Sequence, residues 1–134
     1  MLLPKKTKFR KRFRGSIKGR AWRGGEISFG EYGLKAMAKG DISSRQIEAA
    51  RKVIRGYTER GGKLWIRIFP DKPVSRKPAE IRMGGGKSAV DHYAAEVKIG
   101  RIILEISGVP TLLSLEALKL AAAKLPLATK IVKK

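Results

Sequence analysis

Residues 41–69, "DISSRQIEAARKVIRGYTERGGKLWIRIF", decide the fold because they predict an amphipathic helix followed at once by a buried strand. Ser43 is a typical helix N-cap, and Gln46 completes a capping box with it. Ile42 and Ile47 occupy the two positions of a hydrophobic staple across the same turn. These local signals predict a helix that begins next to Ser43.

The predicted helix buries one stripe and ends at two glycines. Four side chains fall at helical spacing and form that stripe: Ile47, Ala50, Ile54 and Tyr57. Gly61 and Gly62 predict the end of the helix. The basic residues off the stripe suit a solvated face and a phosphate-facing surface equally well: Arg45, Lys52, Arg55 and Arg60. The alternation in residues 63–69 then predicts a strand with one well-buried face: Leu64, Ile66 and Ile68.

Short apolar segments on either side predict further strands. Upstream, residues 27–29 and 34–38 predict two short strands with turns at Gly30 and Gly33. Downstream, residues 92–108 predict a β-hairpin that turns at Ile99 and Gly100. The second strand of this hairpin is expected to point three side chains inward: Ile102, Leu104 and Ile106.

Residues 109–126 predict a second helix, with Pro110 near its start and Pro126 at its end. Its expected core stripe packs against the sheet: Leu113, Ala117, Leu120 and Ala121. Residues 127–132 can form a closing strand. The chain therefore predicts an α+β fold in a single domain, residues 1–134, from which a basic arm (1–25) and an extended loop (70–92) stand apart.

The net charge of +20, from 31 Lys and Arg against 11 Asp and Glu, is the strongest functional signal. It favours a polyanionic partner such as RNA, DNA or an anionic membrane. The membrane is disfavoured because no apolar run approaches the roughly 18 residues needed to span a bilayer, and the basic N-terminus lacks the apolar stretch of a signal peptide. The chain has no cysteine and one histidine, His92, so disulfides and thiolate metal sites are excluded. We expect no cofactor and no metal, and we interpret His92 as structural, with stacking on a nucleotide as the alternative.

Residues 1–25 contain ten basic side chains and no acidic one. The cations are Lys5, Lys6, Lys8, Arg10, Lys11, Arg12, Arg14, Lys18, Arg20 and Arg23, and the interleaved aromatics are Phe9, Phe13 and Trp22. Such a segment suits an arm that pairs with phosphate and stacks on bases or sugars. The alternative is a solvated tail.

Residues 80–90, "EIRMGGGKSAV", look like a phosphate-binding loop and raise the possibility of a nucleotide hydrolase. A P-loop requires glycine where this chain has Ile81, and it leads into a helix. The residues after Ser88 instead alternate as a strand does. We therefore predict that the chain is not an enzyme.

The loop of residues 70–92 is better explained as a surface for RNA phosphate. It is rich in proline, has room for at most a short strand at 79–83, and is too long for a simple connection. Gly84 to Gly86 allow close backbone approach to a phosphate oxygen. Its cations are Lys72, Arg76, Lys77, Arg82 and Lys87. Arg82 is the sharpest candidate because a guanidinium can pair bidentately and stack, whereas a bare surface arginine on a flexible loop is the alternative.

Six motifs give these features a family context. In chain order they are "MLLPKKTKFRKRFRG", "FGEYGLKA", "RQIEAARK", "GGKLWIRIFPDKP", "RMGGGK" and "KLAAAKLP". They closely resemble the bacterial-type large-subunit ribosomal protein sixteen family, which is shared with the archaeal and eukaryotic tenth-e protein. The resemblance covers nearly the whole chain. It implies an α+β fold in which two helices pack on a mixed β-sheet that includes a hammerhead-like motif.

The resemblance also implies a non-enzymatic role in the large ribosomal subunit. The family binds 23S-type rRNA near the A-site tRNA, beside neighbouring ribosomal proteins, and joins late in assembly. We expect no homo-oligomer and no membrane contact, and a location on ribosomes of the cytoplasm or of an organelle matrix. The RNA-binding residues implied by the arm and the loop are Lys5, Lys6, Lys8, Phe9, Arg10, Lys11, Arg12, Arg14, Lys72, Arg76, Lys77, Arg82, Met83, Gly84 and Lys87.

The chain departs from the family pattern at a few positions. Gly85 stands where the family usually has a lysine, and Ser88 stands where it has a glycine. The loop therefore offers fewer phosphate contacts than is usual. The alternative function that shares this charge is a free-standing nucleic-acid chaperone, which would not need the long proline- and glycine-rich loop.

Overall fold

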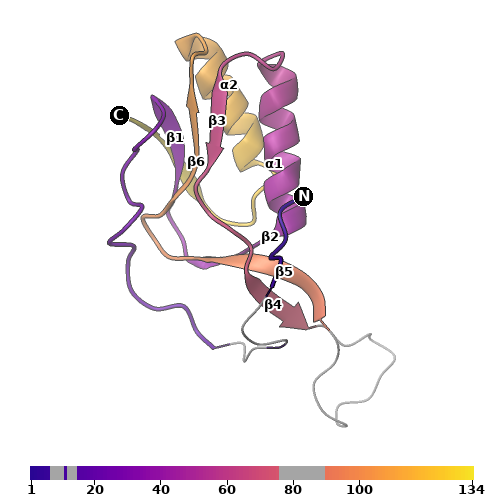
Figure 1. The fold of residues 1–134 in the computed structure, drawn as a ribbon. Coiled ribbons are helices and arrows are strands. Elements are labelled where there is room, and N and C mark those ends of the chain that lie inside the picture. The colour runs from indigo at the N-terminus through magenta and orange to yellow at the C-terminus, as the bar shows by residue number, and fades with distance from the viewer. Residues whose placement is uncertain (7–10, 12–14, 76–89) are drawn as a thin grey trace.

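The computed structural model spans residues 1–134 and describes residues 1–6, 11, 15–75 and 90–134. These residues form two antiparallel sheets and two helices (Figure 1). The elements in chain order are β1 (Tyr32–Ala36), β2 (Gly40–Ser43), α1 (Ser44–Tyr57), β3 (Lys63–Ile66), β4 (Lys72–Ser75), β5 (Val90–Val97), β6 (Ile102–Ser107), α2 (Thr111–Ala122) and β7 (Thr129–Lys133). The predicted α+β class is confirmed, although the strands named here pair antiparallel in two sheets and not in one mixed sheet.

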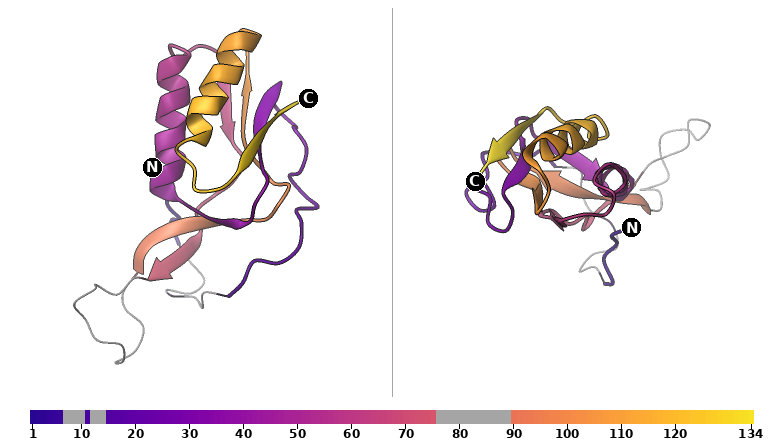
Figure 2. Two further views of the ribbon diagram at one scale, coloured as in Figure 1. Left: turned by 180° about the vertical axis from the view of Figure 1, so that it is seen from behind. Right: turned by 90° about the horizontal axis from the view of Figure 1, so that it is seen from above.

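The larger sheet has the order β3-β6-β1-β7, and the two helices pack side by side along it (Figures 1 and 2). The smaller sheet, β2-β5-β4, lies at the end of the molecule where α1 begins (Figure 1). One cluster of buried side chains joins both sheets and both helices. Its members include Leu34, Ile42, Ile47, Ile54, Val97, Leu104, Ile106 and Leu118.

The start of α1 follows the sequence prediction closely. The Ser43 hydroxyl accepts a hydrogen bond from the Gln46 N–H at 3.2 Å, and the Ser43 N–H donates to Gln46 Oε1 at 2.9 Å. Ile47, Ala50 and Ile54 are buried, as the helical spacing indicated, and Tyr57 is half-buried. The capping box and the apolar stripe are therefore confirmed.

The end of α1 differs from the prediction, because the helix ends at Tyr57 and not at the two glycines beyond it. The Thr58 hydroxyl donates to the Ile54 carbonyl at 2.8 Å, and the Arg60 N–H donates to the Arg55 carbonyl at 2.8 Å. These bonds satisfy carbonyls that the last helical turn leaves without partners. Glu59 and Arg60 adopt left-handed φ values of 54° and 62°, a conformation usually given to glycine.

The predicted strand at residues 63–69 is present but shorter, since β3 ends at Ile66. Leu64 and Ile66 are half-buried, and Ile68 beyond the strand is 7% exposed. The predicted strand at 34–38 appears two residues earlier as β1, and the closing strand is confirmed as β7, which pairs with β1.

The predicted strand at residues 27–29 and the turn at Gly33 are wrong. Residues 27–29 form no strand, and Gly33 lies inside β1. A Cβ at Gly33 would stand 2.7 Å from the Leu104 carbonyl oxygen, so this glycine allows close strand packing. The Ile27 side chain lies over the same position. Residues 23–30 therefore cross the sheet as a loop on the face opposite the helices.

The predicted hairpin of residues 92–108 is also wrong, because its two strands belong to different sheets. β5 pairs with β2 and β4, whereas β6 pairs with β1 and β3. Gly100, at φ 94°, lies in the connection between the two sheets. Residues Ile102 to Ile106 are all at most 1% exposed, so both faces of β6 are buried and not one alone. Alternation of apolar residues identifies a strand but does not identify its partner.

The loop predicted at residues 70–92 contains a strand at its start. β4 holds Pro73 opposite Tyr93 of β5. β4 is an edge strand of the small sheet. Proline is tolerated on an edge strand because its missing N–H can lie on the side without a neighbouring strand. The possible short strand at 79–83 lies outside the described residues. The strand expected after Ser88 is confirmed as β5.

The second helix buries two of the four residues predicted for its core stripe, Ala117 and Ala121. Its buried residues are Ser114, Ala117, Leu118 and Ala121. Leu113 is 39% exposed and Leu120 is 45% exposed, so these two expected core residues lie at the surface. α2 has apolar residues on most of its circumference, and the packing of α1 and β1 selects the buried face.

Candidate nucleic-acid interface

The first residues of the arm lie beside the start of α1 (Figure 1). The Met1 amino group lies 4.0 Å from Glu48 Oε2, and Leu2 packs against the core. Lys5, Lys6 and Lys11 are exposed, as expected for cations that meet a partner. The other RNA-binding residues expected in the arm and the loop lie outside the described residues: Lys8, Phe9, Arg10, Arg12, Arg14, Arg76, Lys77, Arg82, Met83, Gly84 and Lys87.

Lys72 lies in a different environment from the one expected of an RNA contact. It is 4% exposed, and its Nζ lies 3.2 Å from Asp41 Oδ2. Lys72 belongs to β4 and Asp41 to β2, the two strands that flank β5. Because the ion pair links both edges of the small sheet, we assign Lys72 to the fold and leave it out of the proposed RNA surface.

His92 lies near the point where the loop rejoins the small sheet. Its Nδ1 is 2.7 Å from Asp91 Oδ2. The ring borders an open pocket of about 260 Å³ between Met1, Leu3, Arg45 and the start of β5. This volume lies below the roughly 300–1,000 Å³ of most small-molecule sites. The contact with Asp91 supports the structural interpretation of His92.

The basic residues of α1 divide into two groups. Arg51 pairs with Glu48 within the helix. Arg55 is half-buried, and its Nη1 donates to the Gly62 carbonyl at 3.4 Å. Arg45 and Lys52 are exposed, as is Arg60 beyond the end of the helix. Their exposure is compatible with both interpretations of this face, a solvated surface and a surface for phosphate.

The last part of the arm is held by main-chain contacts to the β5–β6 connection. Ala21 N–H donates to the Ile99 carbonyl at 2.9 Å, and Ile102 N–H donates to the Gly24 carbonyl at 2.7 Å. Arg101 Nη1 donates to the Arg23 carbonyl at 2.9 Å. Residues 21–24 are therefore fixed to the folded core, while the side chains of Trp22 and Arg23 are exposed.

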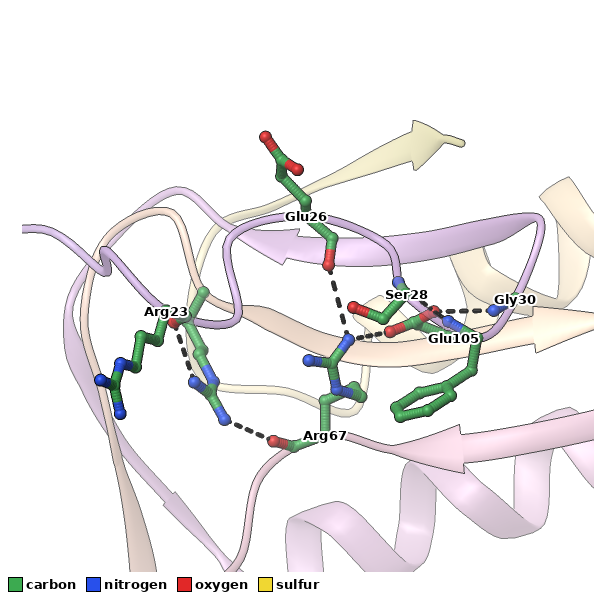
Figure 3. A network of polar contacts seen from close by, with 8 residues as sticks. Arg23, Glu26, Ser28, Gly30, Arg67 and Glu105 are labelled. Atoms are coloured by element: carbon green, nitrogen blue, oxygen red, sulfur yellow. Dashed lines mark hydrogen bonds and ion pairs between the residues drawn. The ribbon is translucent and has the colours of Figure 1, made fainter.

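Glu105 organises the loop that follows. This β6 residue is fully buried, and its Oε1 accepts hydrogen bonds from the N–H groups of Ser28, Phe29 and Gly30 at 3.1, 2.8 and 2.8 Å (Figure 3). Its Oε2 pairs with Arg67. The carboxylate thus ties residues 28–30 to the sheet and is itself neutralised by one guanidinium.

The charge state of Glu105 follows from two opposing effects. Burial alone raises its pKa, because a low-dielectric environment disfavours the ionised form. The hydrogen bonds from Gly30, Arg67, Phe29 and Ser28 together outweigh burial, and the net pKa lies below the ordinary glutamate value. Glu105 is therefore an ionised carboxylate at neutral pH.

Two arginines connect this carboxylate to neighbouring backbone. Arg101 Nη2 donates to the Arg67 carbonyl at 2.7 Å, and Arg67 Nη1 donates to the Glu26 carbonyl at 3.5 Å (Figure 3). Burial first, and the positive charge of Arg67 second, lower the pKa of Arg101. The two guanidiniums hold the loop between Arg23 and Gly30 through contacts with its carbonyls and with Glu105. We therefore assign these two cations to the fold.

An aromatic pair covers the same network. Phe29 stacks on Trp65 with ring centroids 6.0 Å apart, and the Arg67 guanidinium carbon lies 5.1 Å from the Phe29 ring centroid. Phe29 remains 58% exposed. The Phe29 ring therefore lies against one face of the Arg67 guanidinium, in a cation–π contact.

Sequence reasoning missed the network of Glu105, Arg67 and Arg101. One signal was available, since "IILEIS" places a carboxylate in the middle of an otherwise apolar strand. A buried charge requires a partner. The partners come from residues 28–30 and 67, which are distant in the chain, so the sequence does not identify them.

Neither described helix is long and apolar enough to cross a membrane. Within residues 1–6, 11, 15–75 and 90–134, no group of three or more His, Cys, Asp or Glu side chains could hold a metal ion.

Comparison with known protein families gives one match that spans almost the entire chain. A sequence model of the family described as Ribosomal protein L16p/L10e matches residues 4–132. The matched range includes the described arm residues after Leu3, both sheets and both helices.

Proposed function

The chain belongs to the ribosomal protein L16p/L10e family and is therefore a structural constituent of the large ribosomal subunit, and we propose that it binds 23S-type rRNA there and helps to shape the A-site tRNA region. Membership makes it a component of ribosomes in the cytoplasm or in an organelle matrix. The family is structural and is not known as an enzyme family.

The observation that carries the proposal is the one-sided charge of the arm. Residues 1–25 hold ten cations and no acid, and the described lysines of residues 1–18 are exposed: Lys5, Lys6, Lys11 and Lys18. An rRNA backbone would neutralise this charge through phosphate contacts. Lys72, Arg67 and Arg101 are accounted for by contacts within the fold, so we leave these three cations out of the proposed RNA surface.

The loop is proposed as a second RNA-facing segment. Its ends are β4 and the start of β5, which pair in the small sheet. Arg82 and Lys87 are the residues proposed to meet phosphate, with Met83 and Gly84 between them. The single domain of residues 1–134 would then present two RNA-binding segments. Because these segments would bind rRNA that has already folded, we expect the protein to join the subunit late in assembly.

Crosslinking in cells tests the proposal against a free-standing nucleic-acid chaperone. The chain is crosslinked to RNA with ultraviolet light, and the attached fragments are sequenced. Fragments concentrated in one region of the large-subunit rRNA support the proposal. Fragments spread across many transcripts or across the genome support the chaperone and contradict the ribosomal role.

Arg82 is the residue that separates loop function from fold stability. We expect Arg82→Ala to impair tRNA accommodation or subunit assembly, measured as translation rate and as the yield of complete large subunits. The thermal midpoint of the isolated protein should change little, because the sequence predicts Arg82 in a surface loop and a surface substitution is usually worth less than about 0.5 kcal/mol. A large drop in the thermal midpoint with normal translation would contradict this role.

A further inference from the structure

Trp22 is the most exposed large hydrophobic residue among those described, with 97% of its side chain accessible. Tryptophan carries a large apolar surface and usually buries most of it. An indole held almost entirely in water is therefore unfavourable for the isolated chain. A partner that covers the ring would remove this cost.

The backbone that carries Trp22 is fixed on both sides. Ala21 N–H donates to the Ile99 carbonyl at 2.9 Å. On the other side, the carbonyls of Arg23 and Gly24 accept hydrogen bonds from Arg101 Nη1 and the Ile102 N–H. The indole is thus displayed from a segment anchored on the core, which lowers the entropy lost when a partner binds it.

The surroundings of Trp22 are cationic. Lys18, Arg20 and Arg23 are all exposed, and no acidic residue occurs before Glu26. The Arg23 side chain points away from the Glu105 network, while its carbonyl oxygen faces Arg101 (Figure 3). Arg23 can therefore reach a partner without loss of its backbone contact.

We propose that Trp22, Arg20 and Arg23 form a contact site for an unpaired RNA nucleotide. The indole stacks on the base, and the two guanidiniums pair with the phosphates on either side of it. A protein partner fits less well, since the exposed sequence neighbours of Trp22 include three cations and no acid occurs before Glu26. The inference rests on the proposed RNA-binding function and gives a specific role to three arm residues that are not in the RNA-binding set implied by the family resemblance.

Binding of two probes by the purified full-length chain tests the site. The first probe is a fluorescein-labelled single-stranded RNA oligomer of mixed sequence, and the second is an abasic ribose-phosphate oligomer of the same length. Trp22→Ala should weaken binding of the first probe by roughly 5- to 150-fold, the range expected for one base stacked on an aromatic ring. Binding of the abasic probe should stay the same, because its phosphates still meet the arginines.

Matched variants separate stacking from general effects. Trp22→Tyr should restore most of the affinity for the base-containing probe. Leu112 is another strongly exposed apolar residue (77%), and Leu112→Ala should leave the affinity for both probes unchanged. The double variant Arg20→Ala/Arg23→Ala should weaken binding of both probes. The control is the double variant Lys119→Ala/Lys124→Ala, which removes one exposed lysine in α2 and one beyond it and should weaken binding less.

Tryptophan fluorescence gives an independent measurement. In a Trp65→Phe background, Trp22 is the one remaining tryptophan, and the base-containing probe should quench its emission. Equal affinity of wild type and Trp22→Ala for that probe, or absence of quenching, would overturn the stacking site while RNA binding stands. Failure of the wild type to bind either probe would instead overturn the proposed RNA-binding function.

Discussion

At the scale of single residues, Glu105 shows how a buried charge determines local structure. Three N–H groups and one guanidinium surround its carboxylate. Gly30 is required for the approach, because a Cβ there would stand 2.8 Å from the Ile106 carbonyl oxygen. The carboxylate thereby fixes the loop that leads back to Arg23, next to the proposed site at Trp22.

The lowered pKa of Glu105 makes stability depend on pH. A carboxylate whose folded pKa lies below its unfolded value stabilises the fold above the unfolded pKa, about 4.3 for glutamate, and this contribution is lost as pH falls through the folded pKa. At neutral pH we expect Glu105→Gln to lower the free energy of unfolding by about 3–5 kcal/mol, since it leaves Arg67 without its buried partner. Urea titrations measure the difference.

The same comparison at acid pH supplies the control. As pH falls below the unfolded glutamate pKa of about 4.3 and through the lower folded pKa of Glu105, the difference between wild type and Glu105→Gln should shrink. A difference that stays constant from neutral to acid pH would show that shape, and not charge, accounts for the effect. Glu48→Gln serves as a reference, because Glu48 is a surface carboxylate whose hydrogen bond with Arg51 lowers its pKa.

At the scale of elements, the two helices differ in how much their own sequence specifies. α1 begins with a capping box between Ser43 and Gln46, and its apolar residues form one narrow stripe. Its start and its buried face were therefore predictable. α2 begins at Thr111, its N-cap residue Pro110 makes no side-chain hydrogen bond, and leucines occur around the helix. Its buried face depends on contacts with α1 and β1.

Two leucines of α2 test this assignment. Leu118 is fully buried, whereas Leu120, the residue favoured by helical spacing in the sequence, is 45% exposed. We expect Leu118→Ala to lower the free energy of unfolding by about 2–5 kcal/mol. Leu120→Ala should cost at most about 1 kcal/mol, because much of its surface is already in water. Equal losses in urea titrations would mean that α2 is rotated from the orientation described.

At the scale of the whole molecule, the charge of +20 dominates the physics of binding. Few of the cations are matched, since the chain has only 11 acidic residues. Some of these acids are occupied within the fold, as the pairs Lys72–Asp41 and Arg67–Glu105 show. The excess charge is available to an RNA partner.

The salt dependence of RNA binding follows from this charge. If about eight phosphates are neutralised, the logarithm of the association constant should fall with the logarithm of salt concentration at a slope of about −6 to −7. Fluorescence anisotropy of the full-length chain with an rRNA fragment, repeated over a series of salt concentrations, measures the slope. An affinity that is nearly independent of salt would contradict an electrostatic interface.

The sequence by itself determined the features that depend on neighbouring residues or on composition. The capping box, the stripe of Ile47, Ala50 and Ile54, the α+β class and the basic character of the arm belong to this group. The family motifs depend on the chain alone in the same way. Each feature is determined within a few turns or residues, so no distant contact is needed to establish it.

Only the tertiary structure decided which segments meet. It assigned β5 and β6 to different sheets, buried Lys72 against Asp41, and selected Leu118 over Leu120 as a core residue. It also brought residues 28–30 onto Glu105. Apolar periodicity and isolated charges indicate that a side chain needs a partner. They do not identify the partner, because the contact is made with a segment far away in the chain. Their positions are fixed only when the chain packs as a whole.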